Sequence, residues 1–182
     1  MSPVAYIDVP LGPATVEFGD TSPTIFDITK GGVVFSSSST KQDITVDQYG
    51  DTVVKSVFKG RTCQVTVPFA LSDLPKLAKV IPNSTLYTDA TLPEAPKLRL
   101  DVKANAGLNM ASTAEKLVIK PTDPAATPND WITVPLATPI TDPEYTYNAD
   151  NERIANITFV GFPDLTKEGL LYIMGDETVT TA

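Results

Sequence analysis

The chain has 182 residues, of which 42% are hydrophobic and 20% charged, and its formal net charge is −8. This length suits one domain with a substantial core, the hydrophobic fraction excludes a disordered polypeptide, and the acidic balance opposes binding to nucleic-acid phosphates. The absence of histidine and the single cysteine, Cys63, exclude His-dependent catalytic triads and an internal disulfide and argue against the usual zinc sites.

Short runs with strand-like composition, most of them bounded by Pro, Gly, Asp or Asn, recur along the whole chain. The expected strands are residues 4–9, 14–18, 24–28, 33–35, 42–49, 52–58, 62–69, 97–102, 117–120, 131–136, 153–160 and 170–174. This spacing favours a mainly β fold with two packed antiparallel sheets, as a sandwich or partial barrel. We expect a single domain that spans residues 1–182.

The stretch between the glycine pair Gly31-Gly32 and Phe69 gives the most specific strand and turn predictions in the chain. The glycine pair is expected to form a bend that opens a strand, and Gly60 with Arg61 to open a later one. The serine run 36–39 is polar, and we expect it to become ordered only on assembly. In the last strand of the stretch, Cys63 falls on the alternating apolar face and is expected to be buried; a reactive thiol is the alternative.

Residues 42–58 predict a long hairpin in which Gly50 and Asp51 form a two-residue loop. Apolar and charged positions are mixed along both strands, so that neither face is cleanly apolar. Such a hairpin is expected to project beyond the body of the domain. Its polar and charged residues include Asp43, Asp47, Tyr49, Asp51 and Lys55.

One segment, residues 71–84, has the period of a helix instead. Its apolar stripe is formed by Leu74, Leu77, Ala78 and Ile81. Ser72 or Asp73 can cap the start, Pro75 is tolerated in the first turn, and Pro82 ends the helix. The stripe needs a sheet to cover it, so we expect one helix packed on the β structure.

The motifs that suggest chemistry are weak. A calcium loop that starts at Asp47 fails, because position twelve is Phe58 and not glutamate. Carboxylates that a glycoside hydrolase would need are available at Asp142, Glu144, Asp150 and Glu152. Trp131 and the six tyrosines are the residues available for a sugar-binding platform. We expect no enzyme activity, no metal and no cofactor.

Two further expectations concern targeting. Residues 1–12 lack the basic start and apolar core of a signal peptide. The longest apolar run, residues 170–174, is far shorter than a membrane span, so no membrane partner is expected.

Several of these weak signals occur in a distinctive order. GGVVFSSSSTKQDITVDQYGDTVVKSVFKGRTCQVTVPFA (31–70) is followed by SDLPKLAKVIP (72–82), ANAGLNM (104–110), KLVIKP (116–121), ITFVGFPD (157–164) and GLLYIMGDET (169–178). In this order the chain resembles the major tail tube proteins of bacteriophages with long, non-contractile tails. The resemblance covers residues 4–178, and it rests on the order of the motifs.

The resemblance implies a structural subunit with two packed β-sheets and a flanking helix. Such subunits form six-membered rings, which stack into a hollow tube for genome passage in the virion tail. The implied partners are other copies of the chain, other tail proteins and passing DNA without specific binding, with assembly in the host cytoplasm. A ring of six would carry a formal charge of −48, six times −8.

Within this reading, we expect the 42–58 hairpin to form the surface between rings. The strands around Val33 and at residues 153–160 are expected to be the lateral edges. The candidate ring-stacking or lumen-facing residues are Asp43, Asp47, Tyr49, Asp51 and Lys55, and ordinary solvated turn and strand residues are the alternative.

Three other functions stay open. A tail terminator, baseplate ring or head–tail connector would form one ring and no tube. A carbohydrate-binding or adhesin β-sandwich would use Trp131 and the tyrosines. A polysaccharide hydrolase would use two of the carboxylates.

Overall fold

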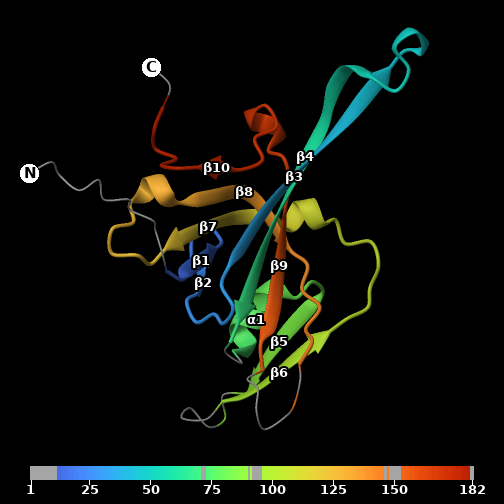
Figure 1. Ribbon diagram of the computed structural model, residues 1–182. Helices are drawn as coiled ribbons and strands as arrows, with labels where there is room; N and C mark the ends of the chain where they lie inside the picture. The colour runs from blue at the N-terminus through green and yellow to red at the C-terminus, as the bar shows by residue number, and fades with distance from the viewer. Residues whose placement is uncertain are drawn as a thin grey trace, which may run out of the picture.

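The computed structural model describes residues 12–70, 73–89, 91, 96–145, 147 and 153–180 (Figure 1). The described chain is mainly β, with two antiparallel sheets and one α-helix, which confirms the predicted fold class. The order of the large sheet is β2-β1-β7-β8-β9-β4-β3, with β10 beside β8, and β5 pairs with β6 in the small sheet. The strand expected at residues 4–9 lies outside the described residues.

The large sheet comprises β1 (Ala14–Phe18), β2 (Thr24–Phe26), β3 (Val34–Thr45), β4 (Val53–Phe69), β7 (Glu115–Pro121), β8 (Ile132–Pro139), β9 (Ala155–Gly161) and β10 (Ile173–Met174). The small sheet comprises β5 (Ser84–Asp89) and β6 (Lys97–Val102). The helix is α1 (Leu74–Val80), and the 3-10 turns are η1 (Asp47–Tyr49), η2 (Met110–Thr113), η3 (Pro128–Asp130) and η4 (Leu165–Lys167).

The large sheet curls into a partial barrel. β2 pairs with β1, and the residues directly after β2 pair with the far end of β4. Ala70 N–H donates to the Ile28 carbonyl at 3.0 Å, and Lys30 N–H donates to the Pro68 carbonyl at 3.1 Å. Gly31 and Gly32 follow with φ of 103° and 86°, which is the predicted bend and lets the chain enter β3.

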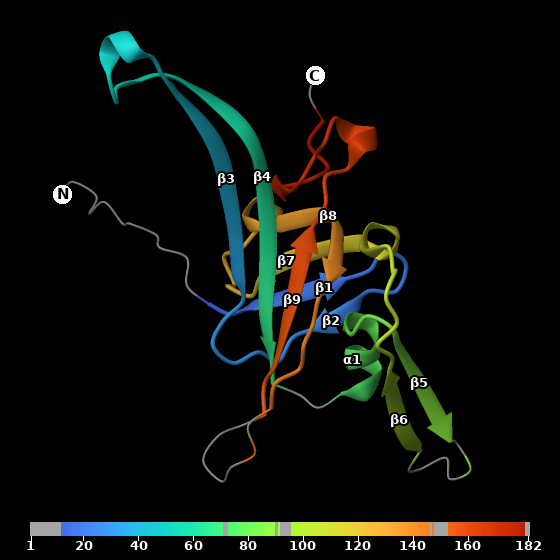
Figure 2. The same cartoon turned by 90° about the vertical axis from the view of Figure 1, so that its right-hand side faces the viewer.

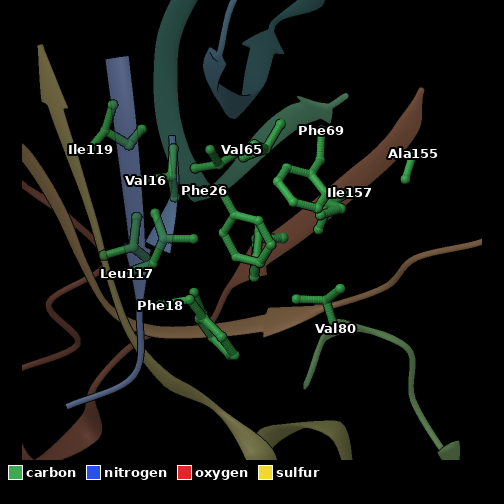
Figure 3. Packing of buried hydrophobic residues seen from close by; sticks show 14 of the residues in the cluster. Val16, Phe18, Phe26, Val65, Phe69, Val80, Leu117, Ile119, Ala155 and Ile157 are labelled. Carbon is green, nitrogen blue, oxygen red and sulfur yellow. The ribbon is translucent and has the colours of Figure 1, made fainter. Parts of the chain in front are cut away.

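Alternating apolar side chains of the strands fill the interior (Figure 3). The fully buried large residues include Val16, Phe26, Val65, Val67, Phe69, Leu117, Ile157 and Phe159. Phe26 meets Phe69 edge-on with 5.2 Å between ring centroids, and Phe18 lies 5.0 Å from Phe159. These rings join β2 to β4 and β1 to β9 across the barrel, so the core holds the curled sheet together.

The helix α1 lies within the segment for which the sequence predicted a helix. Asp73 caps it by accepting a hydrogen bond from Lys76 N–H at 3.2 Å, while the other predicted cap, Ser72, lies outside the described residues. Leu77 and Ile81 of the predicted stripe are buried, but so is Val80, which the stripe omitted. The burial of Val80 shows that the helix contacts the core over a wider face than its apolar period indicates.

The structure corrects three expectations about the long hairpin. The serine run 36–39 is paired within β3 to residues 61–64, because backbone hydrogen bonds order a polar segment once a partner strand is beside it. Gly60 opens no new strand, because β4 passes through it with a register shift that leaves Lys59 unpaired. The loop runs from Val46 to Thr52 through η1 and is not a two-residue turn, although Gly50 has the expected positive φ of 59°.

A close contact beneath β9 leads to a first testable prediction. A Cβ atom added at Gly161 would overlap Cys63 Sγ and lie 3.1 Å from Val134 Cγ1. We expect Gly161→Ala to lower the free energy of unfolding by about 1–3 kcal/mol, because it overpacks a closed core. Urea denaturation measures this value. The same substitution in a Cys63→Ala background should cost less than it does in the native background, and equal costs would contradict the proposed overlap.

Candidate assembly surface

The part of the β3–β4 hairpin formed by residues 36–62 projects from the barrel as a two-stranded ribbon, here called the arm (Figure 2). Every residue of the arm is exposed except Gly60, which is half-buried. The predicted projection of the hairpin is therefore confirmed. An isolated two-stranded hairpin is at best marginally stable in water, so a long one with both faces exposed gains stability from a partner.

The arm concentrates exposed apolar side chains. These are Ile44, Val46, Tyr49, Val53, Val54, Val57 and Phe58. Directly paired residues share a face, so Phe58 lies with Lys41 on one face, while Val57 and Ile44 lie on the other. A concentration of exposed apolar side chains on a projecting element is typical of an interaction site.

All five sequence-predicted site residues lie in the outer half of the arm and are exposed, but they do not share one face. Asp43 and Lys55 belong to neighbouring pairs in the ladder and therefore point to opposite faces. Asp47, Tyr49 and Asp51 lie in the turn that connects the strands. The structure therefore brings the five residues together at the arm without forming a single acidic face.

Asp43 is the candidate with defined partners. The Ser56 hydroxyl donates a hydrogen bond to it, and Lys41 Nζ lies 3.0 Å from its carboxylate. These two interactions, the Ser56 hydrogen bond first, lower the pKa of Asp43 below its ordinary value. Asp43 thus ties the two strands together across the arm.

The arm has two unpaired backbone edges. β3 is the last strand in the sheet order, so its outer edge has no neighbour among the described strands. β4 pairs with β9 only from Gln64 to Phe69, which leaves its other edge open along the arm. β3 carries neither charge nor proline between Ser36 and Thr40, and those are the usual protections of an exposed edge.

Of the two strands expected to be lateral edges, the one near Val33 (β3) ends the sheet, whereas the one at residues 153–160 (β9) lies inside it, which corrects the second expectation. β9 lies between β8 and β4: its β4 side is paired from Ala155 to Val160, and its β8 side is paired from Phe159 to Gly161. The sequence of β9 does not distinguish an inner strand from an edge strand. The alternation of apolar and polar residues indicates which face is buried and carries no information on lateral neighbours.

A groove at the base of the arm was missed by sequence reasoning. It has a volume of about 670 Å³ and is lined by residues from β4 and from the segment between β9 and β10: Phe58, Arg61, Pro163, Leu170, Leu171 and Tyr172. The two stretches are a hundred residues apart, so no local sequence signal identifies the groove.

The residues suggested for other chemistry are not assembled into a site. Asp142 and Glu144 are exposed, and Asp150 and Glu152 lie outside the described residues. Trp131 is half-buried beneath the Lys120 ammonium, which lies 4.6 Å from the centre of a ring. Cys63 is only 2% exposed, as predicted, and burial raises the pKa of its thiol. Within the described ranges, no cluster of His, Cys, Asp or Glu is arranged to hold a metal ion.

Among the described residues, no helix has the length and apolar character needed to cross a membrane. No protein-family model matches the chain, and no curated protein matches it significantly.

Proposed function

We propose that this protein is the subunit of a phage tail tube, forming six-membered rings that stack into a hollow tube for genome passage. The observation that carries the proposal is the arm, whose faces and edges are all open and whose surface is rich in apolar side chains. Its partners are then other copies of the chain and other tail proteins, and its place is the virion tail.

The arm and the barrel supply two kinds of contact surface. A strand of another copy can add to the open edge of β3 or β4, which satisfies backbone groups that otherwise face water. Head-to-tail contacts between copies close into a ring when the rotation from one copy to the next completes a full turn. A second surface then stacks the rings. Each subunit is held by several neighbours at once, so modest contacts produce a stable tube.

The net charge of −8 suits the passage of DNA. An acidic tube repels the phosphate backbone and prevents adhesion during transit. The function needs no catalytic residue and no cofactor.

The test is negative-stain electron microscopy with light scattering, on purified protein first dilute and then concentrated. We expect stacked rings or hollow tubes that increase with concentration. Closed single rings that never stack would instead favour a terminator, baseplate or connector protein. A monomer at every concentration would contradict self-assembly and favour a glycan-binding role, which a glycan screen would then examine.

A further inference from the structure

The groove at the base of the arm is lined by aromatic and aliphatic side chains and by one charged residue among those described, Arg61. Arg61 lies over the Phe58 ring, 5.7 Å from its centre, and one guanidinium nitrogen donates to the Tyr172 hydroxyl at 3.5 Å. Tyr172 in turn packs edge-on against Phe35, with 5.1 Å between ring centroids. The guanidinium is therefore held in place at the mouth of an aromatic and aliphatic groove.

The tip of the arm, residues 46–53, has the complementary chemistry. It contains Asp47 and Asp51 and no lysine or arginine. Tyr49 is 67% exposed there, beside the exposed apolar side chains of Val46 and Val53. An aromatic ring flanked by two carboxylates matches a groove that combines aromatic walls with one guanidinium.

We propose that the tip of one copy docks into the base groove of another copy, with Tyr49 against the aromatic and aliphatic lining of the groove and with the carboxylates of Asp47 and Asp51 at Arg61. The inference rests on the proposed function and names the two surfaces that join successive rings. The tip cannot enter its own groove, because the paired strands hold the two ends of the arm apart (Figure 2).

The physical chemistry of the two surfaces supports this pairing. Tyrosine and arginine are the residue types that most often dominate binding energy at interfaces, particularly where an aromatic ring fills a pocket. Arg61 is already oriented by Phe58 and Tyr172, so binding loses little side-chain freedom. Tip and groove are different surfaces of the same chain, so the contact is head-to-tail and can repeat without limit along an axis.

Disulfide cross-linking between two differently tagged populations tests the contact. One carries Thr52→Cys in the tip and the other Pro163→Cys in the groove, both at exposed positions. The native Cys63 is buried and does not compete. We expect the mixed dimer on mild oxidation, in about tenfold excess over the mixture of Thr52→Cys with Lys97→Cys on β6, which is an exposed control position.

Charge reversal gives an independent readout on the same cross-linking pair. Asp47→Lys with Asp51→Lys in the tip population, or Arg61→Glu in the groove population, should each reduce the cross-link yield about tenfold. Combining both should restore it, and Lys97→Glu should leave it unchanged. Failure of the combined variants to recover would contradict the assigned charge pairing, provided that circular dichroism shows each variant folded.

The outcomes separate this inference from the proposed function. Tubes without the 52–163 cross-link would overturn the docking of tip in groove and leave the tube subunit intact. The cross-link without tubes would support the docking and count against the tube. The absence of both would overturn both.

Discussion

Replacing residues 41–59 with an Asn-Gly turn should yield a folded protein that no longer assembles. Thr40 and Gly60 are directly paired, so a two-residue turn can join them within the existing ladder. Every residue removed is exposed, so the core stays complete. We expect a thermal midpoint within about 4 °C of the native value and a monomer in light scattering at concentrations where the native protein polymerises.

A shorter replacement distinguishes the tip from the rest of the arm. An Asn-Gly turn between the paired residues Thr45 and Val53 removes the loop and keeps the ladder below it. Loss of assembly in this variant would assign the contact to the tip, and normal assembly would assign it to the ladder. Tubes from the armless protein, or its unfolding in circular dichroism, would contradict the role given to the arm.

Phe69→Ala should be among the most damaging single substitutions for stability. Phe69 has no exposed surface, packs edge-on against Phe26 and lies beneath the Lys76 ammonium, which is 5.4 Å from the ring centre. Phe69 therefore links the place where β2 and β4 close the barrel to α1. We expect the free energy of unfolding to fall by about 3–5 kcal/mol, because the truncation leaves a cavity that its neighbours fill only in part. Equilibrium denaturation in urea measures this change.

Phe58→Ala is the matched control, since it removes the same side chain from the same strand. Phe58 is 61% exposed and lies in the arm, so its loss should change the free energy of unfolding by no more than about 0.5 kcal/mol. It should nevertheless weaken assembly, because Phe58 lines the base groove. Equal destabilisation by the two substitutions would contradict the division of β4 into a core half and an arm half.

Local physical chemistry was enough to predict several elements. Asp73 and Pro82 flank an apolar period of 3.6, and α1 ends before Pro82. The alternation through Cys63 and Phe69 predicted a strand with one buried face, and that face is buried. Such signals act between residues close in the chain, which is why they predict local structure without knowledge of the fold.

The same local signals failed where a distant partner decides the outcome. Four serines form part of a strand only because residues 61–64 of β4 lie beside them. The sequence predicts a strand start at Gly60, yet a register shift carries the ladder past it. Residues 153–160 are expected to form an edge, yet β9 has neighbours on both sides. Strand pairing and sheet order are long-range choices that alternation does not encode.

The features of the candidate site also separate into those that the local sequence predicts and those that depend on distant contacts. The sequence alone determined that the protein is a mainly β chain with one capped helix, and that its long hairpin mixes charged and apolar residues. The sequence also predicted that this hairpin projects, but only the tertiary structure decided that Phe58 and Arg61 meet Tyr172 in a groove at its base. The reason is physical: propensity and periodicity act over a few residues, whereas a groove needs the closure of a barrel that brings distant segments together.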